Sequence, residues 1–158
     1  MKNTLVFIHG LESTGRGAKG QFFSERFPQM IIEDYTGDFA ARMKKLGAVL
    51  AGRDNLFIVG SSYGGLMAVQ FATENENRVK KLILLAPALN LEEFKPAGKL
   101  GIPVVVYHGI NDDVVYPGLV KDIALSCFVN LEHHLVDDDH PLHKTFPLLD
   151  WNKLLSAD

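Results

Sequence analysis

The sequence predicts an α/β protein with a doubly wound, mainly parallel six-stranded sheet and helices on both faces. Three observations predict it: short apolar runs recur along the chain, most are continuously apolar rather than alternating, and helix-like segments separate them. Continuous apolar runs are typical of parallel strands covered on both faces, and strands that alternate with helices build such a sheet. The expected strands are 5–8, 30–32, 56–59, 82–86, 104–107 and 131–136.

Four helices are expected between and after these strands, over 39–50, 66–73, 117–127 and close to the C-terminus. The first follows Asp38, a residue type that caps helix N-termini. Its apolar residues share one helical face, namely Phe39, Met43, Leu46 and Leu50. Proline suits the first turn of a helix, so Pro117 should open the third helix and Pro147 the fourth. The fourth helix is expected to have one apolar face, made by Leu148, Trp151 and Leu155.

Length and composition predict one globular domain over 1–158. With 158 residues, of which 47% are hydrophobic and 22% charged, the chain can bury one core but is too short for a second. The net charge of -3 comes without any basic block, so we expect no nucleic-acid partner. The only cysteine, Cys127, permits no intrachain disulfide and is expected to be a small buried hydrophobe.

Nothing in the sequence indicates a membrane segment or an export signal. The apolar run before His9 has only four residues, fewer than a signal peptide needs. No run approaches the roughly 18 to 20 apolar residues that span a bilayer. We therefore expect a cytoplasmic chain with no membrane partner. The sequence predicts no metal and no cofactor, and it leaves the oligomeric state open.

One strand-to-helix turn carries the pattern G-x-S-x-G, over 60–64. Small residues two positions before and after the serine let strand and helix approach closely, so the serine sits on a tight bend with its hydroxyl exposed. The helix N-terminus below it favours negative charge on a bound oxyanion. This context predicts Ser62 as a nucleophile. The simpler alternative is a glycine-rich turn, which could hold a phosphate.

A serine hydroxyl needs a base to take its proton and a carboxylate to orient that base. On this kind of fold the expected chain order is serine, acid, histidine. Asp112 follows the strand 104–107, and His140 follows the strand 131–136. Because three separate turns supply the required residue types in the required order, we predict that Ser62, Asp112 and His140 act together. The base must be unprotonated, so activity is expected to fall in acid.

The choice of acid and base has alternatives. Asp113 is adjacent to Asp112, and only one of the two can reach the imidazole. His143 could replace His140, although we expect it on a following helix. His133 and His134 fall inside a strand and are expected to be structural. The acidic run 137–139 is expected to be a solvated turn, with one carboxylate tuning the histidine.

Acyl transfer also needs two preorganised N–H donors for the oxyanion of the tetrahedral intermediate. They typically come from the residue after the nucleophile and from the loop after an early strand. Here these would be the backbone amides of Tyr63 and Leu11. Because both donors are backbone groups, changes of side chain do not test them directly.

The chain resembles the α/β-hydrolase superfamily over nearly its whole length. The resemblance rests on His9-Gly10, on the 60–65 turn, on His108-Gly109 with Asp112 and Val114-Val115, and on Asp139-His140. The segment 9–19 is similar to the opening of small bacterial esterases and of some acyl-protein thioesterase relatives. The resemblance implies hydrolysis of an ester or thioester through an acyl-serine intermediate.

The chain departs from most members of the superfamily in two ways. It begins directly with the strand that precedes His9, which leaves a minimal six-stranded sheet. The stretch 89–101 is too short for the helical lid that many relatives insert there. The acyl pocket should therefore be open and shallow, which favours short acyl esters over long-chain lipids.

The sequence thus predicts a carboxylesterase-like serine hydrolase whose partner is a small-molecule acyl ester or thioester. An alternative is a catalytically silent protein that keeps the α/β-hydrolase fold and only binds a ligand. A further alternative keeps the fold and changes the reaction, for example to that of a lyase or a peptidase.

Overall fold

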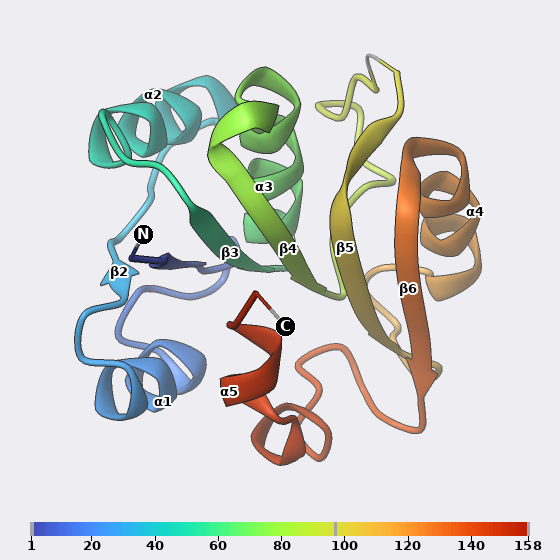
Figure 1. Ribbon diagram of the computed structural model, residues 1–158. Helices are drawn as coiled ribbons and strands as arrows, with labels where there is room; N and C mark the ends of the chain where they lie inside the picture. Colours follow the sequence, from blue (N-terminus) through green and yellow to red (C-terminus); the bar gives the residue numbers. More distant parts are fainter. Residues whose placement is uncertain (1, 97, 158) are drawn as a thin grey trace.

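The computed structural model describes residues 2–96 and 98–157, and its strands form a six-stranded sheet in which each neighbouring pair is parallel (Figure 1). The strand order in the sheet is β2-β1-β3-β4-β5-β6. The predicted fold class is confirmed. The strands are β1 (Thr4–Ile8), β2 (Ile31–Ile32), β3 (Leu56–Ser61), β4 (Val79–Leu85), β5 (Leu100–Gly109) and β6 (Phe128–Val136).

The strand order reverses once, beside β1. The chain runs outward from β1 to β2 and then crosses back to β3 on the other side of β1. The loops that leave the carboxyl ends of β1 and β3 therefore diverge toward opposite faces of the sheet. In open α/β sheets, the crevice at such a point is where ligands bind. The fold thus opens a crevice between the loop after Ile8 and the turn after Ser61.

Helices cover both faces of the sheet, as expected (Figure 1). One face carries α2 (Phe39–Val49), α3 (Tyr63–Glu74) and α4 (Pro117–Cys127), and the other carries α1 (Ala18–Arg26) and α5 (Trp151–Leu154). Two short 3-10 turns complete the elements, η1 (Glu76–Arg78) and η2 (Phe146–Leu148). Two hydrophobic clusters result, one on each face of the sheet.

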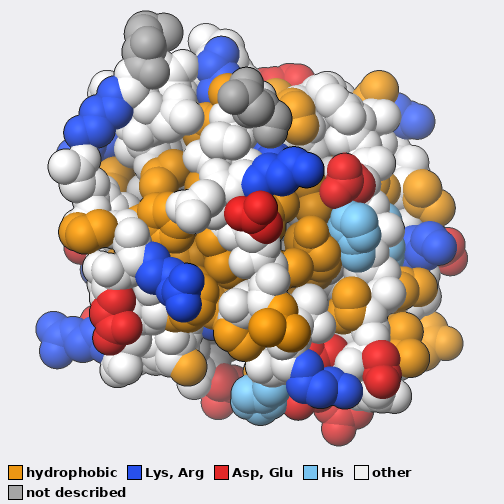
Figure 2. Space-filling view, turned by 60° about the horizontal axis from the view of Figure 1, so that its bottom comes forward, with side chains coloured by type: hydrophobic (Ala, Val, Ile, Leu, Met, Phe, Trp, Pro, Cys, Tyr) orange, Lys and Arg blue, Asp and Glu red, His pale blue; other side chains and the backbone are white. Residues whose placement is uncertain are grey.

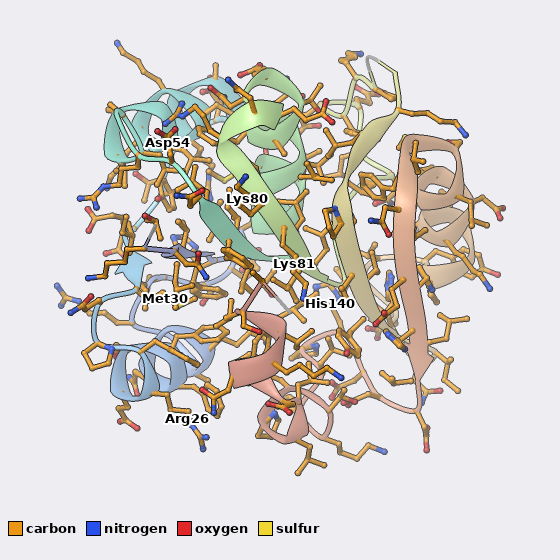
Figure 3. The ribbon with its side chains drawn as sticks, viewed as in Figure 1. Arg26, Met30, Asp54, Lys80, Lys81 and His140 are labelled. Atoms are coloured by element: carbon orange, nitrogen blue, oxygen red, sulfur yellow. The ribbon has the colours of Figure 1, made fainter. Side chains whose placement is uncertain are left out.

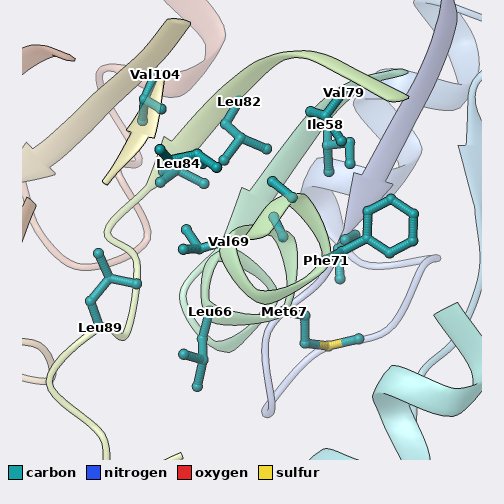
Figure 4. Close-up of a cluster of buried hydrophobic side chains, with 14 of the residues drawn as sticks. Ile58, Leu66, Met67, Val69, Phe71, Val79, Leu82, Leu84, Leu89 and Val104 are labelled. Atoms are coloured by element: carbon teal, nitrogen blue, oxygen red, sulfur yellow. The ribbon is translucent and has the colours of Figure 1, made fainter. Parts of the chain in front are cut away.

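The helix α3 is the most buried of the helices and lies at the centre of its cluster (Figure 4). Nine of its twelve residues are buried. Met67 and Leu66 are fully buried, and Leu82 and Val104 of the sheet belong to the same cluster. Burying side chains of this size stabilises the fold by about 1.5 to 3 kcal/mol each. A helix packed on every side cannot shift easily, so the turn at its N-terminus is held in place.

The structure differs from the sequence prediction at two helices. The helix α1 was not predicted, because its 18–26 segment has a weak apolar face on which only Gly20 and Phe23 are buried. The predicted C-terminal helix is wrong in its start: Pro147 lies in η2, and α5 begins only at Trp151. The Asp150 side chain caps α5 by accepting the amide of Lys153. Leu148 consequently does not lie on the predicted apolar face, and it is 83% exposed.

Cys127 is buried, as predicted. Within residues 2–96 and 98–157, no helix combines the length and the apolar character that crossing a membrane requires. Figure 2 turns the lower edge of Figure 1 forward and shows hydrophobic side chains gathered over the middle of that face. Lysine and arginine side chains are dispersed there among aspartate and glutamate.

Candidate active site

The predicted nucleophile lies on a strained bend between β3 and α3. Ser62 has φ 54° and ψ -114°, a left-handed conformation that a non-glycine residue rarely adopts. Two glycines make the bend sterically possible. A Cβ on Gly60 would lie 2.5 Å from the Gly64 carbonyl oxygen, and one on Gly64 would lie 2.1 Å from the Ile8 carbonyl oxygen. The close approach that the sequence predicted for this turn is therefore present.

The three predicted site residues meet in a hydrogen-bonded chain. Ser62 Oγ lies 3.1 Å from His140 Nε2, and His140 Nδ1 lies 2.6 Å from Asp112 Oδ2. The side chain of His140 is partly buried, and that of Asp112 is fully buried. A carboxylate can only accept, so His140 Nδ1 carries a proton and Nε2 is free to accept one from Ser62. This arrangement can generate a nucleophilic serine oxygen.

The structure distinguishes Asp112 from Asp113. Asp112 Oδ1 accepts the backbone amides of Val114 and Val115, each at 2.8 Å. Burial alone raises the pKa of Asp112, but these amides and His140 outweigh it and hold the pKa below its ordinary value. Asp113 is exposed and makes no hydrogen bond through its side chain within the described part of the chain. The loop therefore presents Asp112, not Asp113, to the imidazole.

The loop that carries His140 is held by a second carboxylate, which corrects the prediction of a solvated turn. Asp138 is 2% exposed. Its Oδ1 accepts the amide of Asp139, and its Oδ2 accepts those of Lys144 and Thr145. Burial raises the pKa of Asp138, but the amide hydrogen bonds outweigh it and lower the pKa to about 2. Asp138 thus organises the loop around His140. The one signal of this role in the sequence is that Asp138 lies in an acidic run.

The three histidines that were considered beside His140 do not line the cleft that holds Ser62. His143 is in a turn rather than on the predicted helix, and its exposed ring hydrogen-bonds Asp139 through Nδ1 at 2.8 Å. His133 and His134 lie within β6, as predicted. Asp139 therefore binds His143 and leaves His140 to Asp112.

His9 fixes the peptide that follows it. Its Nε2 accepts the amide of Tyr35 at 2.8 Å, so its proton sits on Nδ1, which lies 2.7 Å from the Gly10 carbonyl oxygen. The carbonyl and the next N–H point in opposite directions across a trans peptide. Holding the Gly10 carbonyl on the His9 side thus turns the Leu11 N–H to the other side. In the sequence, His9 stands out only as part of the His9-Gly10 motif.

The predicted oxyanion donors lie near Ser62. A Cβ on Gly10 would lie 3.3 Å from the Ser62 Cβ and 3.9 Å from the Tyr63 nitrogen, so the two loops approach closely. Neither the Leu11 amide nor the Tyr63 amide donates a hydrogen bond to a residue that the structure describes. Both amides are therefore available to a ligand, and their catalytic role stays a prediction.

An open cleft of about 400 Å³ lies over the nucleophile. Leu11 and Val114 line it and are 51% and 67% exposed, so the mouth is apolar. Lys19 and Glu12 are the charged side chains of the lining. Figure 3 shows His140 near the carboxyl end of β4, whereas Asp54 lies at the opposite edge of the sheet, before β3. The cleft thus sits at the edge where the strand order predicts a ligand.

No lid covers this cleft within the described residues. The segment between β4 and β5, described at 86–96 and 98–99, contains no helix and no strand. It touches the site through Glu93, which accepts the hydroxyl of Tyr63 at 2.9 Å. Burial, together with this hydrogen bond, raises the pKa of Tyr63 to about 12. The segment thus anchors the side chain of Tyr63 instead of closing over Ser62.

A second hollow, of about 520 Å³, lies at the amino-terminal edge of the sheet. Lys80, Lys81 and Glu132 are its charged lining residues. It does not include Ser62 or His140. Of the residues that the structure describes, no group of three histidine, cysteine or acidic side chains is placed to hold a metal ion.

Solved structures share this fold over nearly the whole chain. Est1E from Butyrivibrio proteoclasticus matches with a TM-score of 0.78 at 16% identity, covering 98% of this chain and 86% of that chain. Alpha/beta hydrolase domain-containing protein 10 from mouse matches with a TM-score of 0.76 at 19% identity, covering 99% and 93%. A monoacylglycerol lipase from Paleococcus ferrophilus matches with a TM-score of 0.74 at 13% identity, covering 99% and 97%. Identities this low establish the fold alone.

The fold is that of the α/β hydrolases. At the level of sequence, the family described as serine aminopeptidase, S33, matches residues 6–100, more than half of the chain and including Ser62. The chain belongs to this family and is a hydrolase of the α/β type. No curated protein matches it.

Proposed function

We propose that this chain is a carboxylesterase-like serine hydrolase that cleaves small esters or thioesters through an acyl-Ser62 intermediate. The observation that carries the proposal is the hydrogen-bonded chain from Ser62 through His140 to Asp112, with distances of 3.1 and 2.6 Å. These distances lie within the range at which a base can take the proton of a nucleophile. The residue types and their order in space support this reaction class.

In the first half of the reaction, Ser62 Oγ attacks the acyl carbon while its proton passes to His140 Nε2. Asp112 stabilises the imidazolium that forms. The carbonyl oxygen becomes an oxyanion, for which the amides of Leu11 and Tyr63 are the candidate donors. Collapse of this tetrahedral intermediate breaks the bond to the leaving alcohol or thiol, which takes its proton from His140.

In the second half, His140 takes a proton from water, and the resulting hydroxide equivalent attacks the acyl carbon of the acyl-enzyme. A second tetrahedral intermediate forms in the same oxyanion site. It collapses with release of the carboxylic acid, and His140 returns its proton to Ser62. The enzyme is thereby regenerated, and no group beyond water is consumed.

The shape of the cleft supports short acyl groups. It is open, apolar at its mouth and lacks a lid within the described residues, so a long chain would remain largely in water. Burial of each methylene is worth about 0.8 kcal/mol, and an open cleft stops gaining that energy after a few carbons. Est1E, which shares the fold, has been solved with ferulic acid bound, and a carboxylic acid is the product class proposed here.

The test is a panel of p-nitrophenyl esters and acyl thioesters of increasing chain length, combined with labelling by a fluorophosphonate probe. We expect activity that peaks at short acyl chains and a probe adduct that disappears in Ser62→Ala. Ser61→Ala is the matched control, because it removes the neighbouring hydroxyl and leaves Ser62 in place. Absence of labelling of the folded protein across the pH range would refute the proposal. Saturable ligand binding without turnover would instead favour the silent binding protein.

A second candidate, release of an N-terminal amino acid from a peptide, is favoured by one observation. Glu12 is the acidic side chain in the lining of the cleft, and a carboxylate there could pair with an α-ammonium group. The family description points the same way. Amino acid p-nitroanilides added to the panel distinguish the two. Turnover of these amides that falls in Glu12→Gln, without ester turnover, would replace the esterase proposal.

A further inference from the structure

His108 is a fully buried histidine that the proposed chemistry does not use. It lies near the end of β5, and strand alternation places its side chain on the same face as Val104 and Val106, the face that α4 covers. The ring is 0% exposed. Its Nε2 lies 3.0 Å from Asp112 Oδ2 and 3.0 Å from the Val115 carbonyl oxygen. A second histidine therefore contacts the carboxylate that orients His140.

The surroundings of the ring fix where its proton sits. Both neighbours of Nε2 are acceptors, so Nε2 carries the proton. Nδ1 is buried and has no hydrogen-bond partner among the described residues, which suits an unprotonated nitrogen better than an orphaned N–H. Burial lowers the pKa of His108, and its hydrogen bonds to Val115 and Asp112 oppose this only in part. His108 is thus a neutral donor at neutral pH.

The carboxylate of Asp112 is held on both oxygens. Oδ1 accepts the amides of Val114 and Val115, and Oδ2 accepts His140 Nδ1 at 2.6 Å and His108 Nε2 at 3.0 Å. The amides alone fix Oδ1, but they leave the charge on Oδ2 facing His140 only. The His108 side chain comes from the face of the sheet that α4 covers and supplies Oδ2 with a second donor besides His140.

We propose that His108 is a positioning residue, whose Nε2–H holds Asp112 Oδ2 toward His140 and draws part of its charge. This inference rests on the proposed function, since it assigns His108 a role in the same reaction. A neutral donor is required for this role. A protonated His108 would place a second cation near the imidazolium of His140 and oppose its formation.

The charged and titratable groups facing His108 are few. Asp112 and His140 face it from the loops after β5 and β6, and His133 faces it from β6, with Lys121 of α4 acting on His133. Burial lowers the pKa of His133 to about 4, with Lys121 adding to the effect, so this neighbour is neutral above that value. Around neutral pH, Asp112 is therefore the charged group that interacts most directly with His108.

The test compares His108→Leu, which removes the donor, with His108→Gln, whose amide nitrogen can occupy the position of Nε2. His133→Gln on the adjacent strand is the matched control. For a short ester, we expect His108→Leu to lower kcat by about 10- to 100-fold with KM changed less than about threefold, as for loss of a hydrogen bond to a charged group. We expect His108→Gln to recover most of this loss and His133→Gln to match the wild type.

The pH profile separates positioning from a purely structural role. Without its donor, Asp112 holds the proton of His140 more strongly, so the acid limb of kcat/KM should move to higher pH in His108→Leu and return in His108→Gln. Thermal melts identify folded variants. Where His108→Leu does not fold, His108→Asn serves instead, because its amide is too short to reach Asp112.

Two outcomes overturn this inference alone: equal activity of folded Leu and Gln variants, or a loss of kcat with an unmoved acid limb. Failure of the proposed function looks different. In that case the wild type itself gives no turnover of esters or thioesters and no probe adduct at Ser62, whatever residue 108 is.

Discussion

The turn at Ser62 and the loop at His140 bring the two reacting groups together by different physical means. Ser62 is positioned by steric fit: Gly60 lets β3 approach α3, and Gly64 lets the end of β1 approach α3, until no Cβ would fit at either contact. His140 sits in a longer loop that polar contacts hold, through Asp138 inside it and through Lys19, which donates to the Pro141 carbonyl at 2.7 Å. The first region is a packed joint throughout. The second is a hydrogen-bonded loop with one such close backbone contact, where a Cβ on Gly109 would lie 2.4 Å from the Asp138 carbonyl oxygen.

This difference affects how each region should respond to mutation. At a close backbone contact, an added side-chain atom cannot be accommodated in part, because the overlap with backbone atoms cannot be relieved by a small shift. A hydrogen-bonded loop can lose one contact and keep the others. We therefore expect changes near Ser62 to act on folding and changes near His140 to act on the rate, in graded steps.

The largest effect is expected from Gly64→Ala. The new Cβ would lie 2.1 Å from the Ile8 carbonyl oxygen, so β1 and α3 must separate. We expect a loss of at least about 3 kcal/mol in unfolding free energy, or roughly 6 to 12 °C in Tm, measured by thermal denaturation. Gly47→Ala is the control, since nothing lies within 4 Å of that Cβ on α2, and it should stabilise by about 0.5 to 1 kcal/mol. A Gly64→Ala protein as stable as the wild type would contradict the packed-joint description.

The second effect is expected from Asp112→Asn. The amide retains an acceptor for the Val114 and Val115 amides, but it presents no charge to the imidazolium of His140. We expect kcat for a short ester to fall by about 10³- to 10⁴-fold. Asp113→Asn, one residue along and exposed, should leave kcat unchanged. If Asp113→Asn is the variant that loses activity, the assignment of the acid is wrong.

The same contrast explains what the sequence could predict. The strand-turn-helix around Ser62 has a local signature, because steric fit demands glycine at fixed spacing. Asp112 and His140 were predicted from chain order and strand ends, and the structure brings both to Ser62. The sheet itself followed from its apolar runs, although β5 and β6 begin earlier than predicted, at Leu100 and Phe128.

What could not be predicted depends on contacts between distant residues. Asp138 lies between two other aspartates, and nothing in its residue type sets it apart from them. Only the folding back of the loop gives it the amides of Lys144 and Thr145. The choice between Asp112 and Asp113 likewise depends on which way one loop turns. The helix α1 was missed because Phe23 is its only buried large side chain, so its apolar periodicity is weak.

The third effect is expected from Asp138→Asn, which tests the hydrogen-bonded loop directly. The new NH₂ group cannot accept the amides of Lys144 and Thr145, so the loop loosens around His140. We expect kcat to fall by about 10- to 100-fold through misplacement of the imidazole. Asp137→Asn is the control, because Asp137 is exposed and its polar contacts with the described residues are to the side chains of Asn111 and Lys144.

The stability of the same variant should also depend on pH in a defined way. The pKa of Asp138 in the folded state is about 2, below its unfolded value of about 3.9. A depressed folded pKa stabilises the protein above the unfolded value, and this stability is lost as pH falls through the folded pKa. The wild type should therefore lose stability between about pH 4 and pH 2, and Asp138→Asn should lose less over that window. Parallel curves for the two proteins in urea denaturation at several pH values would count against the role of Asp138.

The smallest effect is expected from Lys19→Met, which cuts the other support of the loop. Lys19 stands at the start of α1, and burial lowers its pKa, although the charges of Asp139 and Asp138 oppose this. Methionine keeps the apolar stem and removes the donor to the Pro141 carbonyl. Only one hydrogen bond to a neutral acceptor is lost, so we expect kcat to fall only about two- to tenfold. Lys44→Met on the exposed side of α2 is the control.

Because Asp138 and Lys19 support one loop, their effects should be less than additive in the double variant. Strict additivity would mean that the two residues hold separate parts of the site, and the loop would then have to be described as two independent segments.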